Sequence, residues 1–347
     1  MRPSLHSVLL LFASLCLVAL FAGPGGATTW TIGVDSLDCD GLCDFYTPPG
    51  ESENEGIWNA LDGGSVTAGD TILVWPGEYS GGLLLESGVV LISRHGPENT
   101  AIRGLATGVP AVRFLNGNED TRVEGFTLDW DSNATGRGGG ISANATGGTI
   151  ENCIFLNCQS GLGGGVYAEF SEIRLINNVF VGNYAEDGGG AIAITACGPP
   201  FTANPVEIIN NSFYQCEVPF GGAGAVFWAE SSDFEFSNNI ITGTLSSNAI
   251  QCGLSNEQSF TCNIFWDNPL GPYGGECIDF TGSYDNLNID PLFCDAPGSD
   301  FGVCADSPAL GGGCGTIGYV SPDGNCAACG GTALTPGSWG LVKSHYR

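Results

Sequence analysis

The sequence predicts an all-β fold, a single right-handed parallel β-helix, and three observations support this. A short apolar motif returns in steps of 27, 25, 33, 28 and 24 residues, ending at Leu128, Phe155, Phe180, Phe213, Ile241 and Phe265. A glycine motif recurs in phase with it, ending at Ile141, Val166, Ala191 and Ala225. The apolar runs are short, β-branched and broken by Gly and Asn, without helical spacing. A supersecondary unit of about 25 residues, stacked on copies of itself, produces such a pattern.

Each coil is expected to hold three short strands separated by tight turns. The glycine runs 138–140, 163–165 and 188–190 mark a corner at which the backbone bends sharply or approaches its neighbour. The asparagine pairs 177–178, 210–211 and 238–239 each precede a strand. Asparagine tolerates left-handed turn geometry, and stacked Asn side chains can hydrogen-bond from coil to coil. We therefore expect an asparagine ladder running along the solenoid.

Two longer stretches of the sequence resemble one known protein family. Residues Trp58–Gly104, which contain GDTILVWPGEY, resemble the opening of secreted bacterial pectate-lyase-like β-helix repeat proteins. In that family a short capping helix leads into this strand and turn. Residues Asn288–Val320, with DPLF, SPAL and IG, resemble the closing segment of the same family. The resemblance covers roughly residues 54–326, and it implies the fold more than any one function, because one scaffold carries unrelated sites.

The chain divides into five segments on composition. Residues 1–27 have a basic start, a short apolar run and a small residue at Ala27, which predicts a secretory signal peptide cleaved near Ala27. A Cys-containing segment (28–53) precedes the β-helix (54–293), whose N-terminal helix is expected near Trp58. A Cys-rich closing segment (294–329) is expected to cap the C-terminal end, and a linker with a short basic tail follows (330–347). No stretch is long enough to span a membrane.

The cysteines predict disulfides. Of 15 cysteines, removing Cys16 with the signal peptide leaves 14, an even number in an exported chain. Four pairs are close enough for local loops: 39/43, 153/158, 294/304 and 326/329. Cys158 and Cys216 align across coils with Asn183 between them, and two coil steps of about 4.8 Å each put them beyond disulfide reach. A zinc site is the rival interpretation, but few histidines are available for one.

The charge is strongly acidic, with a formal net charge of −28. Between Arg174 and Lys343 the sequence has no basic residue. Nucleic acids and anionic membranes are bound through Lys and Arg, so both are excluded as partners. Cations and neutral or basic partners are favoured instead.

The residues argue against the well-known polysaccharide-cutting chemistries on such scaffolds. No histidine lies between Gly96 and Ser344, and there is no Arg-x-Lys, which a polygalacturonase-like site would need. The pattern around a pectate-lyase catalytic arginine is also missing. A generic glycoside hydrolase needs only two suitably spaced carboxylates, for which Glu169, Glu186 and Asp187 are candidates. Solvated surface carboxylates remain the simpler interpretation of these residues.

A binding face has somewhat better support. Aligning Val166, Ala191 and Ala225 puts Tyr167, Ile192 and Val226 in one column, and Glu169, Ile194 and Trp228 in a second. If Ala168 and Ala193 point inward, alternation puts Tyr167, Glu169 and Trp228 outward. Together with Glu186 and Asp187 these residues would suit sugar stacking. The insertion Ala196–Pro205 could equally cover these residues, and this packing explanation is favoured over a binding face.

Two acidic groups are candidates for a structural Ca²⁺ site. Asp35, Asp38, Asp40 and Asp44 surround a glycine near the N-terminus, and Asp129 and Asp131 lie in LDWDSN. Calcium prefers such oxygen-rich turns. Neither group has the spacing or the closing glutamate of an EF-hand loop.

The leading expectation is a secreted or surface-attached, non-catalytic β-helix protein that binds carbohydrate or another cell-surface component. A polysaccharide-degrading hydrolase or lyase is the first alternative, and a purely structural or adhesive envelope protein is the second. The tail PGSWGLVKSHYR carries Lys343, the only lysine, and Arg347. It resembles the ending of other secreted β-helix proteins, which suggests a sorting or attachment tag as an alternative to a frayed terminus.

Overall fold

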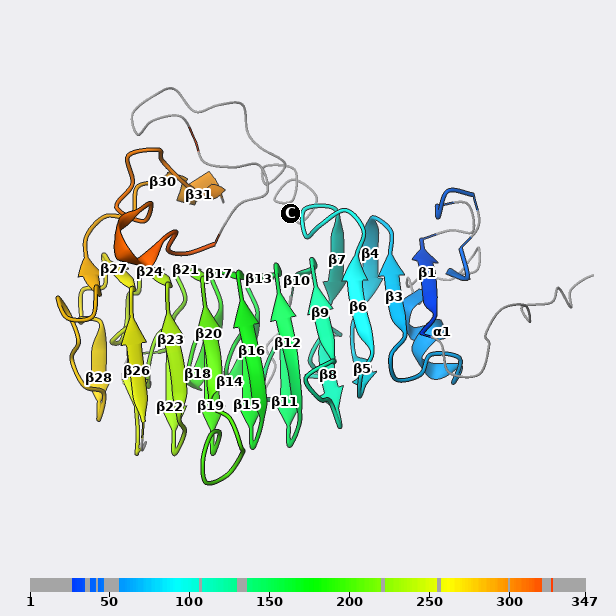
Figure 1. The fold of residues 1–347 in the computed structure, drawn as a ribbon, viewed down its shortest axis with the longest axis horizontal. Coiled ribbons are helices and arrows are strands. Elements are labelled where there is room, and N and C mark those ends of the chain that lie inside the picture. The colour runs from blue at the N-terminus through cyan, green and yellow to red at the C-terminus, as the bar shows by residue number, and fades with distance from the viewer. Residues whose placement is uncertain are drawn as a thin grey trace, which may run out of the picture.

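The chain folds into a right-handed parallel β-helix with three parallel sheets along its length (Figure 1). The computed structural model describes residues 27–34, 38–41, 43–46, 56–105, 108–129, 136–219, 222–254, 257–298, 300–319 and 326. Residues 1–26 of the predicted signal peptide, Asp35, Asp131 and the basic tail lie outside these residues. The fold class predicted from the repeats is confirmed.

Each sheet takes one strand from each coil, and neighbouring strands in a sheet come from successive coils. Sheet A contains, in spatial order, β2 (Phe45–Tyr46), β1 (Thr29–Gly33), β3 (Thr71–Val74), β6 (Val90–Ser93), β9 (Arg122–Glu124), β12 (Gly147–Glu151), β16 (Glu172–Ile176), β20 (Val206–Ile209), β23 (Phe234–Ser237) and β26 (Gln258–Thr261). Sheet B contains β29 (Leu287–Asn288), β27 (Ile264–Trp266), β24 (Ile240–Thr242), β21 (Ser212–Tyr214), β17 (Val179–Val181), β13 (Ile154–Leu156), β10 (Thr127–Asp129), β7 (Thr100–Arg103) and β4 (Gly77–Ser80). Sheet C contains β28 (Tyr273–Gly275), β25 (Ile250–Cys252), β22 (Phe227–Glu230), β19 (Ile192–Thr195), β15 (Val166–Glu169), β11 (Ile141–Asn144), β8 (Val112–Leu115) and β5 (Leu83–Glu86).

The two ends of the solenoid differ. Helix α1 (Gly56–Asp62) buries Ile57 and Ala60 against the first coils, as expected of a capping helix near Trp58. Trp58 also donates its indole N–H to the carbonyl of Gly81 at 2.8 Å. No helix in the described part of the chain is long and apolar enough to cross a membrane. At the other end, β28 is the edge strand of sheet C and β29 is the edge strand of sheet B. Within the described residues, each therefore pairs with one neighbouring strand.

The interior is a stack of buried aromatic and aliphatic side chains. The rings of Phe155, Phe180 and Phe213 stack on successive coils, with centroids 4.5 and 4.9 Å apart. These phenylalanines end the sequence motif that defines the period. Because each inward side chain meets the equivalent side chain of the next coil, the repeat itself specifies the core.

The predicted asparagine ladder is present. Its rungs are Asn178, Asn211, Asn239, Asn263 and Asn286, all buried. The backbone N–H of each rung donates to the side-chain oxygen of the next, at 2.8 to 3.1 Å. The residue before each rung has left-handed φ, as at Asn177 and Asn210. The first asparagine of each pair therefore makes the turn and the second makes the ladder.

The Cys-rich segment follows the outer face of sheet B instead of lying across the end of the solenoid (Figure 1). We call residues 293–319 the strap; it contains the antiparallel pair β30 (Phe293–Asp295) and β31 (Asp300–Val303), and the short 3₁₀ helices η1 (Ala296–Gly298) and η2 (Gly312–Cys314). Phe301 packs with Ile154 and Val179 in one buried cluster. Apolar side chains that point outward from sheet B are thus removed from water by the strap.

The disulfides match the predictions in part. Cys39 and Cys43 are bonded, as predicted. Cys153 and Cys158 are free and buried, so the predicted loop between them is wrong. The exclusion of a 158/216 bond is confirmed, because Asn183 lies between these cysteines and contacts both.

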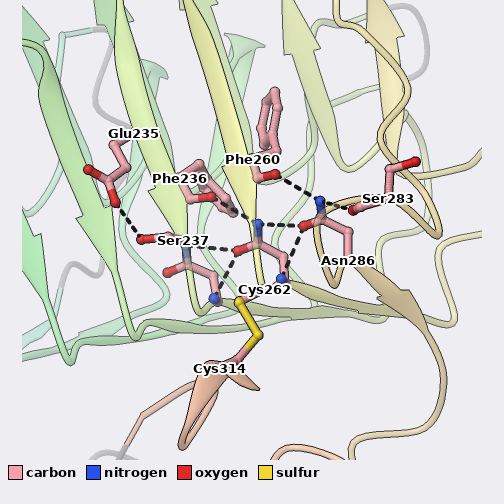
Figure 2. The surroundings of a disulfide bond; sticks show 10 residues. Glu235, Phe236, Ser237, Phe260, Cys262, Ser283, Asn286 and Cys314 are labelled. Atoms are coloured by element: carbon pink, nitrogen blue, oxygen red, sulfur yellow. Dashed lines mark hydrogen bonds between the residues drawn. A yellow bond between two sulfur atoms is a disulfide. The ribbon is translucent and has the colours of Figure 1, made fainter. Parts of the chain in front are cut away.

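The C-terminal pairings are also wrong, because folding of the strap brings distant cysteines together. Cys294 is bonded to Cys326, in place of the local pairs 294/304 and 326/329. Cys304 is disulfide-bonded as well. Two further bonds, Cys252–Cys277 and Cys262–Cys314, were not predicted. The second of these ties the strap to the solenoid beside the asparagine ladder (Figure 2).

Candidate functional site

The candidate site lies on the outer face of sheet C. There, Tyr167 of β15 pairs with Ala193 of β19, which pairs with Trp228 of β22. Glu169, Thr195 and Glu230 form the adjacent outward column in the same register. Tyr167 and Trp228 thus share one column, two coils apart.

The predicted columns are therefore wrong by one residue at β19 and by two at β22, because residues are inserted before each of these strands. Strand β18 (Tyr184–Gly188) pairs with β14 (Gln159–Leu162), but the register shifts by one residue between Ser160 and Leu162. One extra residue is accommodated there as a bulge at Glu186–Asp187. The glycines that are equivalent across coils have positive φ, and they are Gly138, Gly163, Gly189 and Gly224. In a run of three glycines the sequence alone does not reveal which one takes this position.

Tyr167 points outward but is covered. Its side chain is 1% exposed, because the guanidinium of Arg137 lies over the ring with its carbon 4.9 Å from the ring centroid. Arg137 also donates to the Tyr167 hydroxyl at 2.8 Å and to Glu169 Oε2 at 2.9 Å. Asn144 donates to the same carboxylate oxygen at 3.0 Å. Burial raises the pKa of Tyr167, so the phenol stays neutral.

Arg137 is the residue of this site that the sequence reasoning missed. It lies 30 residues before Tyr167, immediately before the glycine corner. Its backbone forms an isolated parallel β-bridge with Leu162 of the next coil. Its position before the positive-φ glycine of its coil is a signal that could have found it. Arg137, Tyr167 and Glu169 here form one hydrogen-bonded group, with the guanidinium stacked over the tyrosine ring.

Trp228 is the part-exposed aromatic residue of the face. One side of the indole lies against Gly188, where an added Cβ would come within 3.3 Å of the ring. Glu186 and Asp187, which are exposed, lead directly into Gly188. Gln251 follows Trp228 in the outward column, and Glu230 lies on the same strand. The structure therefore brings Trp228 close to the segment that carries the two predicted acidic residues.

The insertion after β19 does not account for the burial of Tyr167. Its Phe201 packs edge-on against Phe170, with ring centroids 6.1 Å apart, at the corner between β15 and β16. Glu172 accepts hydrogen bonds from Ala203 N–H at 2.6 Å and from Asn204 at 3.0 Å. The hydrogen bond from Asn204 is the main reason why the pKa of Glu172 is lowered. On the sheet C face itself, Thr195, Trp228 and Glu230 remain part-exposed.

The acidic residues proposed as calcium ligands are used for other contacts. Asp38 accepts the N–H of Val34, and Asp44 accepts the N–H and hydroxyl of Thr31, all at 2.7 to 2.8 Å. Asp40 lies 3.9 Å from Arg94. Asp129 lies in β10, far along the chain from the N-terminal aspartates. Asp35 and Asp131 lie outside the described residues. Among the described residues, the potential metal-binding groups both contain disulfide sulfurs: Cys294, Cys304 and Cys326, and Cys262, Asp285 and Cys314.

Comparisons with known proteins assign no activity to this chain. No protein-family model matches the chain, and no curated protein matches its sequence. A solved structure that it resembles is the pectin methylesterase from Aspergillus niger in deglycosylated form, with a TM-score of 0.36 and 13% identity. The match covers 78% of this chain and 92% of that one. No activity is carried over at this level of similarity.

Proposed function

We propose that this protein is a secreted or surface-attached, non-catalytic solenoid that binds a neutral polysaccharide along the outer face of sheet C. The observation that carries the proposal is the part-exposed indole of Trp228, with Gln251 and Glu230 beside it and the small residues Ala193 and Gly188 around it. An aromatic ring stacks on the apolar face of a sugar. Neighbouring amides donate hydrogen bonds to the sugar hydroxyls and accept from them, and neighbouring carboxylates accept from them.

The charge of the chain selects the class of glycan. With a net charge of −28, the protein repels uronate polymers, whereas neutral polymers carry no such penalty. Arg137 does not compensate, because its guanidinium is already bound to Tyr167 and Glu169. We therefore expect binding to neutral glucans, mannans or xylans rather than to pectate.

A binding role is favoured over catalysis by the chemistry of the face. Glu169, a candidate catalytic carboxylate, is engaged in a hydrogen-bonded ion pair with Arg137. Tyr167 is neutral and covered, and the sequence supplies no histidine between Gly96 and Ser344. A glycoside hydrolase needs two carboxylates at one glycosidic bond; with Glu169 paired, Glu186, Asp187 and Glu230 are the remaining carboxylates on this face, and analysis of products tests them.

The test is incubation of the purified protein with a panel of neutral and acidic polysaccharides, with and without Ca²⁺. Retention on the polymer and mass-spectrometric detection of products are measured on the same samples. Retention on a neutral glycan without new reducing or unsaturated ends is the expected result. Cleavage products would replace the proposal with a polysaccharide hydrolase or lyase, and no retention on any glycan would leave a structural or adhesive protein.

A further inference from the structure

The last coil of the solenoid is left open. It comprises β28, the connection 276–286 and β29, and we call residues 273–289 the terminal coil. Strand β28 pairs with β25 and strand β29 with β27, and the structure describes no strand on their other edges. The ladder also closes here, since Asn286 donates its side-chain N–H to Phe260 and Ser283 of the chain itself (Figure 2). Unpaired edges of this kind are ready to accept another strand.

The open end is also apolar. Of the fourteen exposed large hydrophobic residues in the described chain, eight lie between residues 245 and 289. The terminal coil itself carries Ile278 (55% exposed), Tyr284 (66%), Leu287 (38%) and Ile289 (44%). Leu287 belongs to β29, the edge strand of sheet B. Four exposed apolar side chains on the one coil whose strand edges are open favour this coil as an interaction surface.

The charge of the surface limits what can bind there. Glu276, Asp279 and Asp285 are exposed on the terminal coil, and the sequence has no Lys or Arg from residue 175 to 342. A second copy would bring the same carboxylates to the interface, and like charges would repel. The segment that complements the surface is 336–347 of the same chain, which supplies Lys343 and Arg347 together with aromatic and aliphatic residues.

This segment begins within reach of the terminal coil. The strap is fixed to the penultimate coil by the Cys262–Cys314 disulfide, shown in Figure 2, and Cys326 is bonded to the strap through Cys294. Ten residues separate Cys326 from Pro336, counting Pro336 itself. At about 3.3 Å per residue they can extend roughly 33 Å, which is several times the 4.8 Å spacing of coils.

We propose that residues 336–347 dock on the terminal coil, adding a strand beside β29. Backbone hydrogen bonds to the free edge supply affinity. Leu287 and Ile289 contact the apolar side chains of the segment, while its basic residues lie near the acidic groups of the coil. This is recognition by strand addition, with alternate side chains giving specificity. It is independent of glycan binding on sheet C.

The test uses a chain truncated after Thr335 and a fluorescent peptide of residues 336–347. Anisotropy should show saturable binding to the truncated protein, weakened by 0.5 M NaCl. Binding should be at least tenfold weaker to the full-length chain, whose own segment occupies the site. A Leu287→Ser/Ile289→Ser variant of the truncated chain should also lose at least tenfold. The matched control, Leu84→Ser/Leu115→Ser on sheet C, should bind as the parent does.

Several outcomes would overturn the proposal. They are no binding to the truncated chain, equal binding to the truncated and full-length chains, or equal binding to the Leu287/Ile289 variant and its control. Circular dichroism and thermal melting of each variant establish that a loss of binding is not a loss of fold. A full-length dimer that dissociates when Leu287 and Ile289 are replaced would identify a second copy as the occupant, against the proposal.

Discussion

Replacing Asn211 with alanine removes one rung from the middle of the asparagine ladder. The side chain of Asn211 is fully buried. Its oxygen accepts the backbone N–H of Asn178 at 2.8 Å, and its amide donates to the carbonyl of Leu175 at 2.9 Å. Alanine supplies neither group, and the site is closed to water by the coils on both sides. Two buried backbone groups are therefore left without these partners.

The expected cost follows from those two groups. Each buried backbone group left unsatisfied costs about 1 to 3 kcal/mol, so the variant should lose about 2 to 6 kcal/mol of unfolding free energy. The matched control is Asn210→Gly, one residue earlier. Asn210 has φ of 57° and belongs to the turn rather than the ladder, and glycine adopts that conformation readily. The control should change stability by less than about 1 kcal/mol.

Urea unfolding measures the two variants, and amide hydrogen exchange at Asn178 locates the effect. The Asn211→Ala protein should unfold at lower urea, and the Asn178 amide should exchange faster by a factor that exceeds any change at distant coils. Stability in solenoids is a sum over repeats and their neighbours, so the effect should be local. A loss below about 1 kcal/mol, or one equal to that of Asn210→Gly, would refute the assignment of a stabilising role to the ladder.

Three further predictions test other parts of the structure. Burial raises the pKa of Cys153 and Cys216 to about 12 and that of Cys197 to about 11. These thiols and the buried Cys158 should therefore resist a thiol reagent in the native protein and react only on unfolding. Rapid labelling of the native protein would contradict this. Burial alone would raise the pKa of Asp70, but hydrogen bonds from Thr28, Thr67 and Trp30 outweigh it, and the pKa is lowered from 3.8. The resulting stability is complete above pH 3.8 and is lost as pH falls through the lower folded-state pKa, so proteolysis near β1 should increase only in that acid range, and Asp70→Asn should remove the pH dependence. Gly163→Ala places a Cβ 2.1 Å from the Val166 carbonyl oxygen, whereas the Cβ of Gly282→Ala meets nothing within 4 Å. Positive φ destabilises both variants by about 1 kcal/mol, but only Gly163→Ala should show a much lower melting temperature.

The architecture was predictable from sequence because its determinants are local and repeated. The phenylalanines at the end of each motif form the stacked core, and the second asparagine of each pair forms the ladder. Both features follow from the period alone. The capping helix near Trp58 was also accessible, through the resemblance of the segment that contains it.

The register of sheet C was not predictable in the same way. The extra residue at Glu186–Asp187 sits beside three consecutive glycines, so the sequence permits two alignments that differ by one residue. Only the pairing of β14 with β18 distinguishes them. A further shift follows before β22, where the offset between paired residues grows from 33 (Tyr184 with Glu217) to 35 (Gly188 with Ala223). Trp228 therefore lies two residues from its predicted column, and because side chains alternate along a strand it still points outward, in the column of Tyr167 instead of that of Glu169.

The contacts missed altogether are long-range. Arg137 covers Tyr167 from 30 residues away, and Cys262 is bonded to Cys314 across 52 residues. The strap lies along sheet B because several coils expose apolar side chains there, a property of the assembled sheet that no single coil displays. Pairings of this kind depend on the complete fold.

The most direct test of the central claim is the affinity of a Trp228→Ala variant for the neutral glycan that retains the parent protein. Affinity electrophoresis measures the dissociation constant, with Phe201→Ala as a control for an exposed aromatic residue outside sheet C. Loss of an aromatic anchor costs about 2 kcal/mol or more, so the account predicts binding at least tenfold weaker for Trp228→Ala and unchanged for Phe201→Ala. Equal affinity of the two variants, with the fold of each intact, would show that the sheet C face is not the binding surface.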